Sequence, residues 1–433
     1  MQPIEIQPAT ASLGIGSRFL RSSAVRRVAQ NIAALSVAQA ATYLLPLVVI
    51  PYTAAVLGPK NLGLTALIQA VVQYSSSITG YGFSYSATRQ AAIFQNDPQK
   101  LAEIFGRVLA AKLLLMAACF IVGALVFALS PSLRPLFLPY VCASIAVIGT
   151  AFYMDWFFQA IEEMKWMTIF NTVPKLLLTP LIFVFVKKPA DYIWLLLLQA
   201  TAPFLTGIAG AAFMFYRLRG NLSRPTIRAV REQFAEGWHT FLGSMSANFY
   251  TSTNTVILGS LSNATAVGYY SAAQKLVVGI QSMWSPFSQA VYPYFCKTFQ
   301  SNPQRAAQNL KRLSLGVGAI TLTAAIVLSL TAPYFIPAYL GPQYQHSIGI
   351  MQVLIFSVAA VTLNSILGLQ GVVAAGLNSD FLRVVAIVTV LDLLLAPIGI
   401  KLLAEKGLAA AFVCAELFGC FCWYQTLKKR AIF

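Results

Sequence analysis

Two lysines lie inside long apolar stretches, where a charged side chain is unfavourable. Lys175 follows a proline in TVPKLLLTP, and Lys275 lies in SAAQKLVVGI. A cation at the centre of a bilayer costs about 2.5–3.5 kcal/mol on insertion scales, so each lysine is a functional candidate. Two ammonium groups facing one cavity suit a multivalent anion such as a pyrophosphate or an acidic sugar. The alternative is that a buried carboxylate neutralises each lysine.

Two further cations lie near the ends of apolar stretches. Arg89 closes the second stretch, where it would act as a gate, contact a lipid headgroup, or only anchor the helix at the interface. Lys112 lies near enough to the polar end of its stretch that we expect its side chain to reach the surface. We therefore keep Arg89 as a candidate for a gate or a headgroup contact and leave Lys112 out.

Three carboxylates lie within apolar stretches, namely Asp155 in FYMDWFFQA, Asp392 and Glu416. Asp392 and Glu416 each lie twelve residues from position 404, the expected turn of the last hairpin. Both therefore lie about 18 Å from that turn, and two carboxylates at one depth could share a proton or bind Na⁺. Equal depth does not establish that they face each other. In the alternative interpretation, each carboxylate pairs with a hydroxyl or a lysine.

Polar and aromatic side chains mark a further candidate surface. The segment NFYTSTNT, residues 248–255, is too polar to face lipid. Together with the serines that follow Tyr74, it could line a path for a sugar; the alternative is polar packing between helices, or an interfacial belt for the aromatic residues. The candidate cavity residues of this set are Tyr74, Tyr250, Asn254 and Tyr270.

The elements that must position these side chains are membrane-spanning helices. The chain has 433 residues, 58% hydrophobic and 10% charged, with a mean hydropathy of +0.70. Soluble proteins have roughly 25% charged residues, so the composition predicts an all-α polytopic membrane protein. We expect twelve spans of the length that a bilayer requires, at residues 29–56, 61–83, 104–130, 136–160, 166–187, 190–216, 236–260, 266–293, 311–332, 345–371, 380–402 and 407–427.

Basic residues predict the orientation of these spans. With the N-terminus inside, 21 of the 30 Lys and Arg residues lie in cytoplasmic segments and 6 in the opposite loops. Such an excess predicts that both termini are cytoplasmic. The longest loops are expected at 84–103, 217–235 and 294–310, and the arginines of 217–235 have helical spacing. This connector is expected to rest on anionic headgroups, or else to be a solvated loop that serves orientation alone.

The chain divides into two halves that resemble each other. Residues 44–89 form an expected transmembrane hairpin with its turn at Leu57-Gly58-Pro59, and Gly63 and Gln69 follow. In the second half, Leu258-Gly259 is followed by Gly268 and Gln274, with the same six-residue spacing from Gly to Gln. An internal two-fold repeat would place these residues at equivalent positions in the two halves. We therefore expect an arm (1–28), an N-lobe (29–216), a connector (217–235), a C-lobe (236–427) and a tail (428–433).

The sequence gives little support for an enzyme or for a nucleic-acid-binding protein. His239 and His346 are the only histidines, and there is no P-loop sequence. The six cysteines show no C-x-x-C pairing and are expected to be small buried hydrophobic residues. The net charge of +17 is explained by orientation rather than by nucleic acid. We expect no catalysis, no cofactor and no metal.

Three runs resemble a known family: residues 44–90, DWFFQAIEEMKWMTIFNTVPKLLL at 155–178, and 253–295. They are similar to polysaccharide flippases of the Wzx type, the RfbX-like branch of the multidrug/oligosaccharidyl-lipid/polysaccharide exporter superfamily. The family usually has an acidic residue where this chain has Gln90, and often a glycine where it has Ala160. The resemblance covers nearly the whole chain.

The resemblance implies a V of two pseudo-symmetric six-helix lobes around a central cationic cavity, to which Arg89, Lys175 and Lys275 would contribute. It implies a flippase in the bacterial cytoplasmic membrane that moves undecaprenyl-pyrophosphate-linked oligosaccharide units by alternating access. Its partners would be membrane lipids, H⁺ or Na⁺, and glycan polymerase and chain-length machinery. The alternatives are a cation-coupled multidrug exporter of the same superfamily and an integral-membrane enzyme of glycan assembly.

Overall fold

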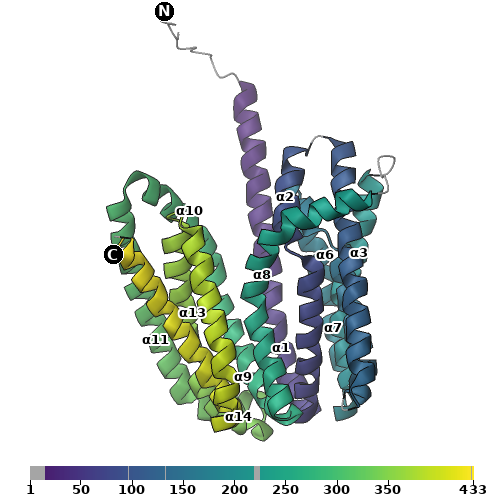
Figure 1. The fold of residues 1–433 in the computed structure, drawn as a ribbon, viewed down its shortest axis with the longest axis vertical. Helices are drawn as coiled ribbons and strands as arrows, with labels where there is room; N and C mark the ends of the chain where they lie inside the picture. The colour runs from purple at the N-terminus through teal and green to yellow at the C-terminus, as the bar shows by residue number, and fades with distance from the viewer. Residues whose placement is uncertain (1–14, 96, 132, 219–224, 431) are drawn as a thin grey trace, which may run out of the picture.

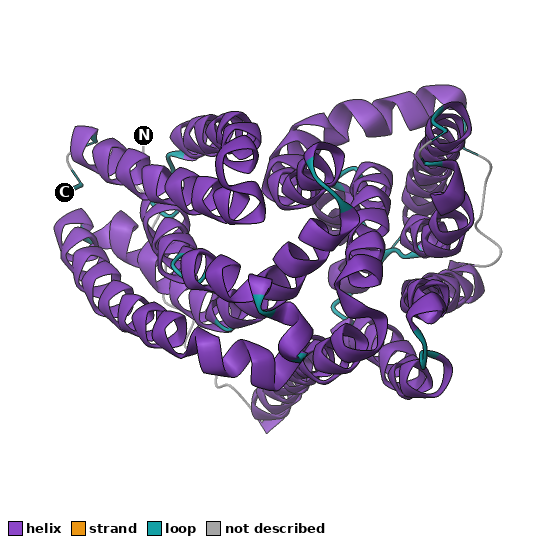
Figure 2. Cartoon of the chain, turned by 90° about the horizontal axis from the view of Figure 1, so that it is seen from below, coloured by secondary structure: helices purple, strands orange, loops and turns teal. Residues whose placement is uncertain are grey.

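Every element of the described chain is helical. The computed structural model describes residues 15–95, 97–131, 133–218, 225–430 and 432–433, and for 15–44, 239–240 and 242–251 it describes the backbone alone. The helices form two bundles side by side, seen upright in Figure 1 and from below in Figure 2. The bundles lie close together at the lower end of Figure 1 and diverge towards the upper end, as the expected V requires.

The N-lobe contains seven α-helices and two short 3₁₀ turns. Its first helix bends sharply at Gly58, where the backbone leaves helical geometry (φ 69°, ψ 170°), so residues 15–57 and 59–80 form two antiparallel limbs. The elements are α1 (Ile15–Gly80), α2 (Phe83–Ile93), α3 (Pro98–Leu129), η1 (Arg134–Leu136), α4 (Phe137–Phe152), α5 (Asp155–Ala160), α6 (Met164–Phe185), η2 (Pro189–Asp191) and α7 (Tyr192–Leu218).

The C-lobe repeats this order. Its last element, α14, also contains a bend, at Leu403 and Ala404, which is the turn expected for the last hairpin. The elements are α8 (Ile227–Leu261), α9 (Ala264–Ser282), α10 (Trp284–Ser301), α11 (Pro303–Leu340), η3 (Pro342–Tyr344), α12 (His346–Leu354), α13 (Ser357–Ser365), the π-helix η4 (Ile366–Val373) and α14 (Asn378–Lys429).

These elements make twelve crossings. Eight helical segments of the described chain are long and apolar enough to span a membrane, and two of them, Leu45–Ile93 and Asn378–Lys429, contain the bends and therefore cross twice. The two remaining crossings are α8 and the pair α9–α10, which run along the other helices in Figure 1 but carry more polar side chains. The polytopic all-α class is confirmed.

A second copy of a loop motif supports the internal repeat. FQNDPQK, residues 94–100, joins α2 to α3, and FQSNPQR, residues 299–305, joins α10 to α11. In each copy the acidic or amide residue caps the next helix: Asp97 Oδ1 accepts from the backbone N–H of Gln99 at 3.0 Å, and Asn302 Oδ1 from that of Arg305 at 2.9 Å. Proline then occupies the first helical turn, where its missing N–H has no consequence.

The two lobes cross in close contact at Gly63 and Gly268. A β-carbon on Gly63 would lie 1.7 Å from the carbonyl oxygen of Ala264, and one on Gly268 would lie 1.8 Å from that of Pro59. Each glycine therefore packs against the residue four positions before the other, so the contact obeys the internal two-fold relation. Only glycine allows two helix backbones to approach this closely, as in other membrane helix pairs.

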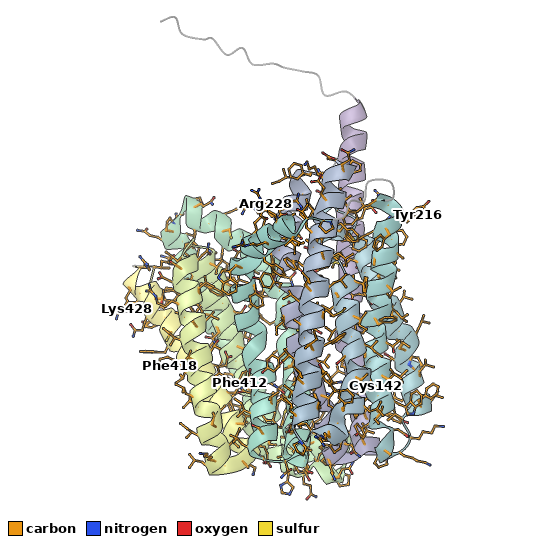
Figure 3. The ribbon with its side chains drawn as sticks, turned by 45° about the vertical axis from the view of Figure 1, so that its right-hand side comes forward. Cys142, Tyr216, Arg228, Phe412, Phe418 and Lys428 are labelled. Carbon is orange, nitrogen blue, oxygen red and sulfur yellow. The ribbon has the colours of Figure 1, made fainter. Side chains whose placement is uncertain are left out.

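At the opposite end, α8 contacts the N-lobe although it begins the C-lobe. The ring of Phe241 stacks on Tyr81 with centroids 4.4 Å apart, and Phe234 meets the same ring edge-on at 5.1 Å. Figure 1 shows the first part of α8 crossing over the N-lobe before the helix turns down between the lobes. In Figure 3, Arg228 of α8 and Tyr216 of α7 lie at the end from which the N-terminal helix projects, and Cys142 lies towards the other end.

Several expected boundaries are wrong. The span expected at 61–83 stops at Gly80, because Tyr81 and Gly82 adopt left-handed backbone angles (φ 47° and 67°). The loops expected at 84–103 and 294–310 are mostly helix, since α2 continues to Ile93 and α3 begins at Pro98, while α10 continues to Ser301 and α11 begins at Pro303. The described part of the connector at 217–235 is also largely helical: α8 already begins at Ile227.

The turn between α6 and α7 is held by one carboxylate. The backbone N–H groups of Lys187 and Lys188 donate to Asp191 at 3.0 and 2.8 Å. These bonds hold the pKa of Asp191 below its ordinary value, because they favour the ionised carboxylate. The turn therefore has a fixed shape at neutral pH although it is exposed.

Candidate functional site

Lys175 and Lys275 lie on the wall of one cavity. The cavity has a volume of about 620 Å³ and is enclosed by the first limb of α1, by α6 and α7, and by α9 of the other lobe. Lys175 comes from α6 and Lys275 from α9, so each lobe supplies one ammonium group. We call this space the lysine cavity. Most of its wall is apolar, and its uncharged polar side chains include Thr53, Gln69, Gln199 and Gln274.

No carboxylate neutralises the two lysines in the described chain. That part contains every Asp and Glu except Glu5, and all six of its ion pairs involve other cations. No acidic residue lines the lysine cavity either. The cavity therefore carries two uncompensated positive charges, an arrangement that a bound anion would stabilise.

A second cavity adjoins the first and lies wholly within the N-lobe. It has a volume of about 530 Å³ and lies between the second limb of α1, α4 and α7. Gln69, Gln199 and Pro203 line both cavities, and the amide groups of the two glutamines are hydrogen-bonded to each other at the boundary. We call this space the polar cavity, because half of its lining residues are Gln, Ser or Thr and none is charged.

Lys175 and Asp392 occupy matching positions in the two halves. Lys175-Leu-Leu-Leu-Thr-Pro180 in α6 corresponds to Asp392-Leu-Leu-Leu-Ala-Pro397 in the first half of α14. Their neighbours match as well: Thr53 lies five residues before Gly58, and Asn254 lies five residues before Gly259. The same position thus carries a cation in one lobe and an acid in the other, and the matching K-L-L-L-T-P and D-L-L-L-A-P segments make this visible in the sequence.

Asp392 is buried against Asn254 of α8. Its side chain is 1% exposed and that of Asn254 is 0% exposed, and Asn254 Nδ2 donates to Asp392 Oδ2 at 2.9 Å. The other oxygen of each side chain, Asp392 Oδ1 and Asn254 Oδ1, has no hydrogen-bond partner among the described residues. Two buried oxygens without a donor are unfavourable, and a proton or a small cation would satisfy them.

Glu416 lies in a separate environment. Its Oε2 accepts from Asn364 Nδ2 at 2.6 Å, and the same amide donates to its backbone oxygen at 2.9 Å. Asp392 is bonded to α8, whereas Glu416 is bonded to α13. The two carboxylates therefore do not form the shared-proton pair that their equal depth would have allowed, because the helix rotations point them at different neighbours.

Asp155 and Lys112 lie in the N-lobe and line neither cavity. Ser84 Oγ donates to Asp155 Oδ1 at 2.9 Å. Lys112 is only 3% exposed, so the expectation that it reaches the surface is wrong. Its Nζ donates to the backbone oxygens of Thr150 and Tyr153 at 3.2 and 2.7 Å. These carbonyls end α4, where a cation satisfies groups that lack partners within the helix.

The remaining candidates do not line either cavity. Arg89 lies on α2, exposed, beyond the break at Tyr81 and Gly82. Tyr270 is 1% exposed and belongs to a core that the C-lobe forms with α1, and sequence cannot distinguish such a residue from a cavity aromatic residue. Tyr74 Oη donates to Thr253 Oγ1 of α8, between the lobes. The side chain of Tyr250 lies outside the described residues.

Side chains of the C-lobe close the end near Gly58. Pro51 and Pro59 have no N–H, which removes the helical bonds to the carbonyl oxygens of Leu47 and Ala55. Tyr339 Oη donates to the Leu47 oxygen, and Gln343 Nε2 donates to the Ala55 oxygen at 3.2 Å. The adjacent Ala54 oxygen accepts from Gln343 at 3.0 Å and from Tyr344 Oη at 3.2 Å. We call Tyr339, Gln343 and Tyr344 the carbonyl latch.

Two six-helix lobes with matching element order, a cavity lined from both lobes and a closure at one end define a two-lobed, all-α polytopic membrane protein. No cluster of metal-ligating side chains occurs in the residues that the structure describes. The chain belongs to the family described as "Polysaccharide biosynthesis protein", whose model matches residues 28–299.

Two curated relatives are similar over most of their length. The chain is 27% identical over 389 residues to the "Putative O-antigen transporter" of Escherichia coli (strain K12), covering 89% of this chain and 93% of that protein. It is also 27% identical over 371 residues to the protein of the same name from Shigella dysenteriae, covering 85% and 91%.

Solved structures share the fold at low sequence identity. The lipid II flippase MurJ in an inward closed conformation superposes with a TM-score of 0.75 at 12% identity, covering 91% of this chain and 87% of that one. An inward-facing multidrug resistance transporter of the MATE family gives a TM-score of 0.61 at 16% identity, covering 93% and 98%. These similarities establish the two-lobed fold.

Proposed function

We propose that the protein is a flippase that moves undecaprenyl-pyrophosphate-linked oligosaccharide units across the bacterial cytoplasmic membrane. The observation that carries the proposal is the lysine cavity, in which Lys175 and Lys275 from opposite lobes share one wall without a carboxylate. A diphosphate offers several anionic oxygens to two ammonium groups. The names of the curated relatives, O-antigen transporters, point to the same substrate class.

The mechanism is alternating access. The diphosphate binds between the two lysines, the glycan lies against polar side chains, and the prenyl chain stays in lipid. Movement of one lobe against the other then exchanges the open end for the closed end, as in transporters built from two repeats. The glycine crossing and the carbonyl latch close one end. Since the basic loops lie mostly at the other end, we assign the closed end to the periplasm and both termini to the cytoplasm.

Asp392 is our candidate for ion coupling. Binding of H⁺ or Na⁺ to its unpartnered oxygen would neutralise the buried carboxylate and give the Asn254 oxygen a partner. The site lies between α8 and α14, whereas the matching position in the other lobe carries the substrate-facing Lys175. The two lobes would therefore divide the work, one binding the anion and the other binding the coupling cation. Glu416 and Asp155 remain secondary candidates for ion coupling. The partners that would use the translocated oligosaccharide are a glycan polymerase and its chain-length machinery.

The alternative functions have less support. A multidrug exporter for cationic compounds needs an acidic or apolar cavity, and the lysine cavity has two lysines and no acid. An enzyme of glycan assembly needs groups that exchange protons with substrate. In the described chain, the carboxylates in or near the spans are each held by a hydroxyl or an amide: Asp155, Asp392 and Glu416.

The test is complementation of a flippase-deleted strain that carries the matching glycan locus. We compare the wild type with Lys275→Ala, Lys275→Arg and the control Lys401→Ala, which removes an exposed cation away from both cavities. Wild type, Lys275→Arg and the control should restore surface polysaccharide, whereas Lys275→Ala should not, at equal amounts of protein in the membrane.

Each other result counts against part of the proposal. Full activity of Lys275→Ala would make this lysine a packing residue and remove the two-cation model. Failure of the wild-type chain to restore the polymer, together with export of a cationic dye by the same cells, would favour the multidrug alternative.

A further inference from the structure

The polar cavity presents a row of uncharged side chains along one face of a helix. Gln69, Gln73, Ser76 and Ser77 follow one another at helical spacing on the second limb of α1, so all four face the same side. Thr150 of α4 and Gln199 of α7 lie on the opposite walls. The row consists of amides and hydroxyls, which both donate and accept hydrogen bonds.

Three of these side chains have no internal hydrogen bond. Among the described residues, the side chains of Gln73, Ser76 and Ser77 take part in no hydrogen bond, whereas other spanning residues such as Thr150 bond through the side chain to their own helix backbone. Polar groups inside a membrane protein are unfavourable unless water or a ligand satisfies them. The polar cavity is thus prepared for a ligand that is rich in hydrogen-bonding groups.

The walls of this cavity are held close together by glycines. A β-carbon on Gly149, beside Thr150, would lie 2.2 Å from the carbonyl oxygen of Pro203, and one on Gly207 would lie 2.2 Å from the Gly149 oxygen. The α4–α7 pair therefore packs backbone to backbone and forms a firm wall. A preformed wall with fixed polar groups is typical of a specific ligand site.

The position of the polar cavity relative to the lysine cavity identifies the ligand. The two share Gln69, Gln199 and Pro203, so a molecule with its diphosphate between Lys175 and Lys275 reaches the polar cavity through the glutamine pair. In a lipid-linked oligosaccharide, the first sugar is attached to the diphosphate. We propose that the polar cavity is the sugar subsite and that it accepts uncharged sugars bearing hydroxyl and acetamido groups. This inference rests on the proposed flippase function.

No charged side chain lines the polar cavity, and for this reason we expect its sugar to be uncharged. A sugar carboxylate placed there would lose its hydration and find no cation among the lining residues. The lysines of the neighbouring cavity are already occupied by the diphosphate in this arrangement. Uncharged hexoses and N-acetylhexosamines lose only hydroxyl and amide hydration, which the glutamine and serine side chains replace.

The experiment measures binding to the full-length protein in detergent with three synthetic probes. They are a polyprenyl diphosphate without sugar, the same lipid bearing N-acetylglucosamine, and the same lipid bearing glucuronic acid. The variants are Gln73→Ala alone and Gln73→Ala combined with Ser76→Ala and Ser77→Ala. Gln289→Ala is the control, since it removes an exposed amide of α10 that lines neither cavity.

The wild type should bind the N-acetylglucosamine lipid at least tenfold more tightly than the bare lipid, and the glucuronic acid lipid no better than the bare lipid. The triple variant should lose the tenfold gain and bind the bare lipid as the wild type does, since each lost bond contributes modestly. The single variant should lose part of the gain, and Gln289→Ala none. Lys275→Ala should weaken all three probes alike.

Four results would overturn either the sugar subsite or the proposed flippase function. Equal wild-type affinity for the bare and the N-acetylglucosamine lipid would remove the sugar subsite and leave the flippase standing. Equal loss of all probes in both the single and the triple variant would make these residues structural. Preference for glucuronic acid would overturn the uncharged class. Failure of the wild type to bind any probe would overturn the proposed function itself.

Discussion

The glycine crossing between the lobes allows one prediction to be worked out in detail. In Gly63→Ala, the new β-carbon would lie 1.7 Å from the Ala264 oxygen, 2.7 Å from the Gly268 nitrogen and 2.8 Å from the Ala264 carbonyl carbon. All three are backbone atoms, so no flexible side chain can move away. The second limb of α1 and α9 must therefore separate by about 1.5 Å, because overpacked groups are accommodated by backbone shifts.

Overpacking of this kind costs about 1–3 kcal/mol, and the cost falls on the state in which this end is closed. If the other state does not form the crossing, the ratio of open to closed molecules should rise by about 5- to 150-fold. Gly268→Ala should act alike, because its β-carbon would lie 1.8 Å from the Pro59 oxygen. The double variant should shift the ratio of open to closed molecules little further than either single variant, since both substitutions force the same two helices apart.

The measurement is the distance between spin labels at positions 60 and 345, introduced through a non-natural amino acid so that the native cysteines remain. Lys60 and Gln345 are exposed and lie in opposite lobes near the crossing. In lipid nanodiscs, Gly63→Ala should add a longer-distance population. Gly316→Ala is the control, since its β-carbon meets nothing within 4 Å. A distance distribution identical to that of the wild type would refute the steric argument.

Three further predictions follow from single contacts. Gln343→Leu should lower thermal stability by about 1 kcal/mol, because the Ala55 oxygen loses its donor, whereas the exposed Gln345→Leu should not; equal melting temperatures would contradict this. Asp392→Asn should retain binding of lipid diphosphate but lose the dependence of transport on an imposed H⁺ or Na⁺ gradient, and a retained dependence would exclude Asp392 as the coupling site. Lys112→Met should destabilise the protein by about 2–3 kcal/mol, measured by chemical unfolding in detergent, and unchanged stability would mean that Lys112 does not support the end of α4.

Ten of the twelve crossings could be predicted from apolar length alone, and the basic loops and the internal repeat indicated the two more polar ones, α8 and α9–α10. The turns at Gly58 and at position 404 also follow from the sequence, since a glycine-proline pair or a hairpin of known length fixes them. The breaks in the helices were harder to predict from the sequence. Tyr81 adopts a left-handed conformation that its residue type does not favour, and the packing of its ring between Phe83 and Phe241 explains it.

The site was predictable in part, for a geometric reason. A charge in an apolar stretch is visible in the sequence, so Lys175 and Lys275 could be identified. The direction of a side chain around its helix is not visible, so the equal depth of Asp392 and Glu416 left open whether they meet, and they face different helices. Lys112 was misjudged for the same reason, because it points at the end of α4 rather than along its own helix. Gln69 and Gln199 were missed because glutamine carries no charge to mark it.

The carbonyl latch means that the first helix of one lobe is completed by the other lobe. When the lobes part at this end, the carbonyl oxygens of Leu47 and Ala55 lose Tyr339 and Gln343, and their own helix offers no N–H in return. In hydrocarbon, each bare carbonyl would cost several kcal/mol, so lipid tails cannot hold this seam open. Water and the hydroxyl groups of a sugar chain can do so, because they donate hydrogen bonds to these carbonyl oxygens. If the lobes part as proposed, the seam opens only as it becomes wet, and a cargo with its own hydrogen-bond donors would lower the barrier to its own release.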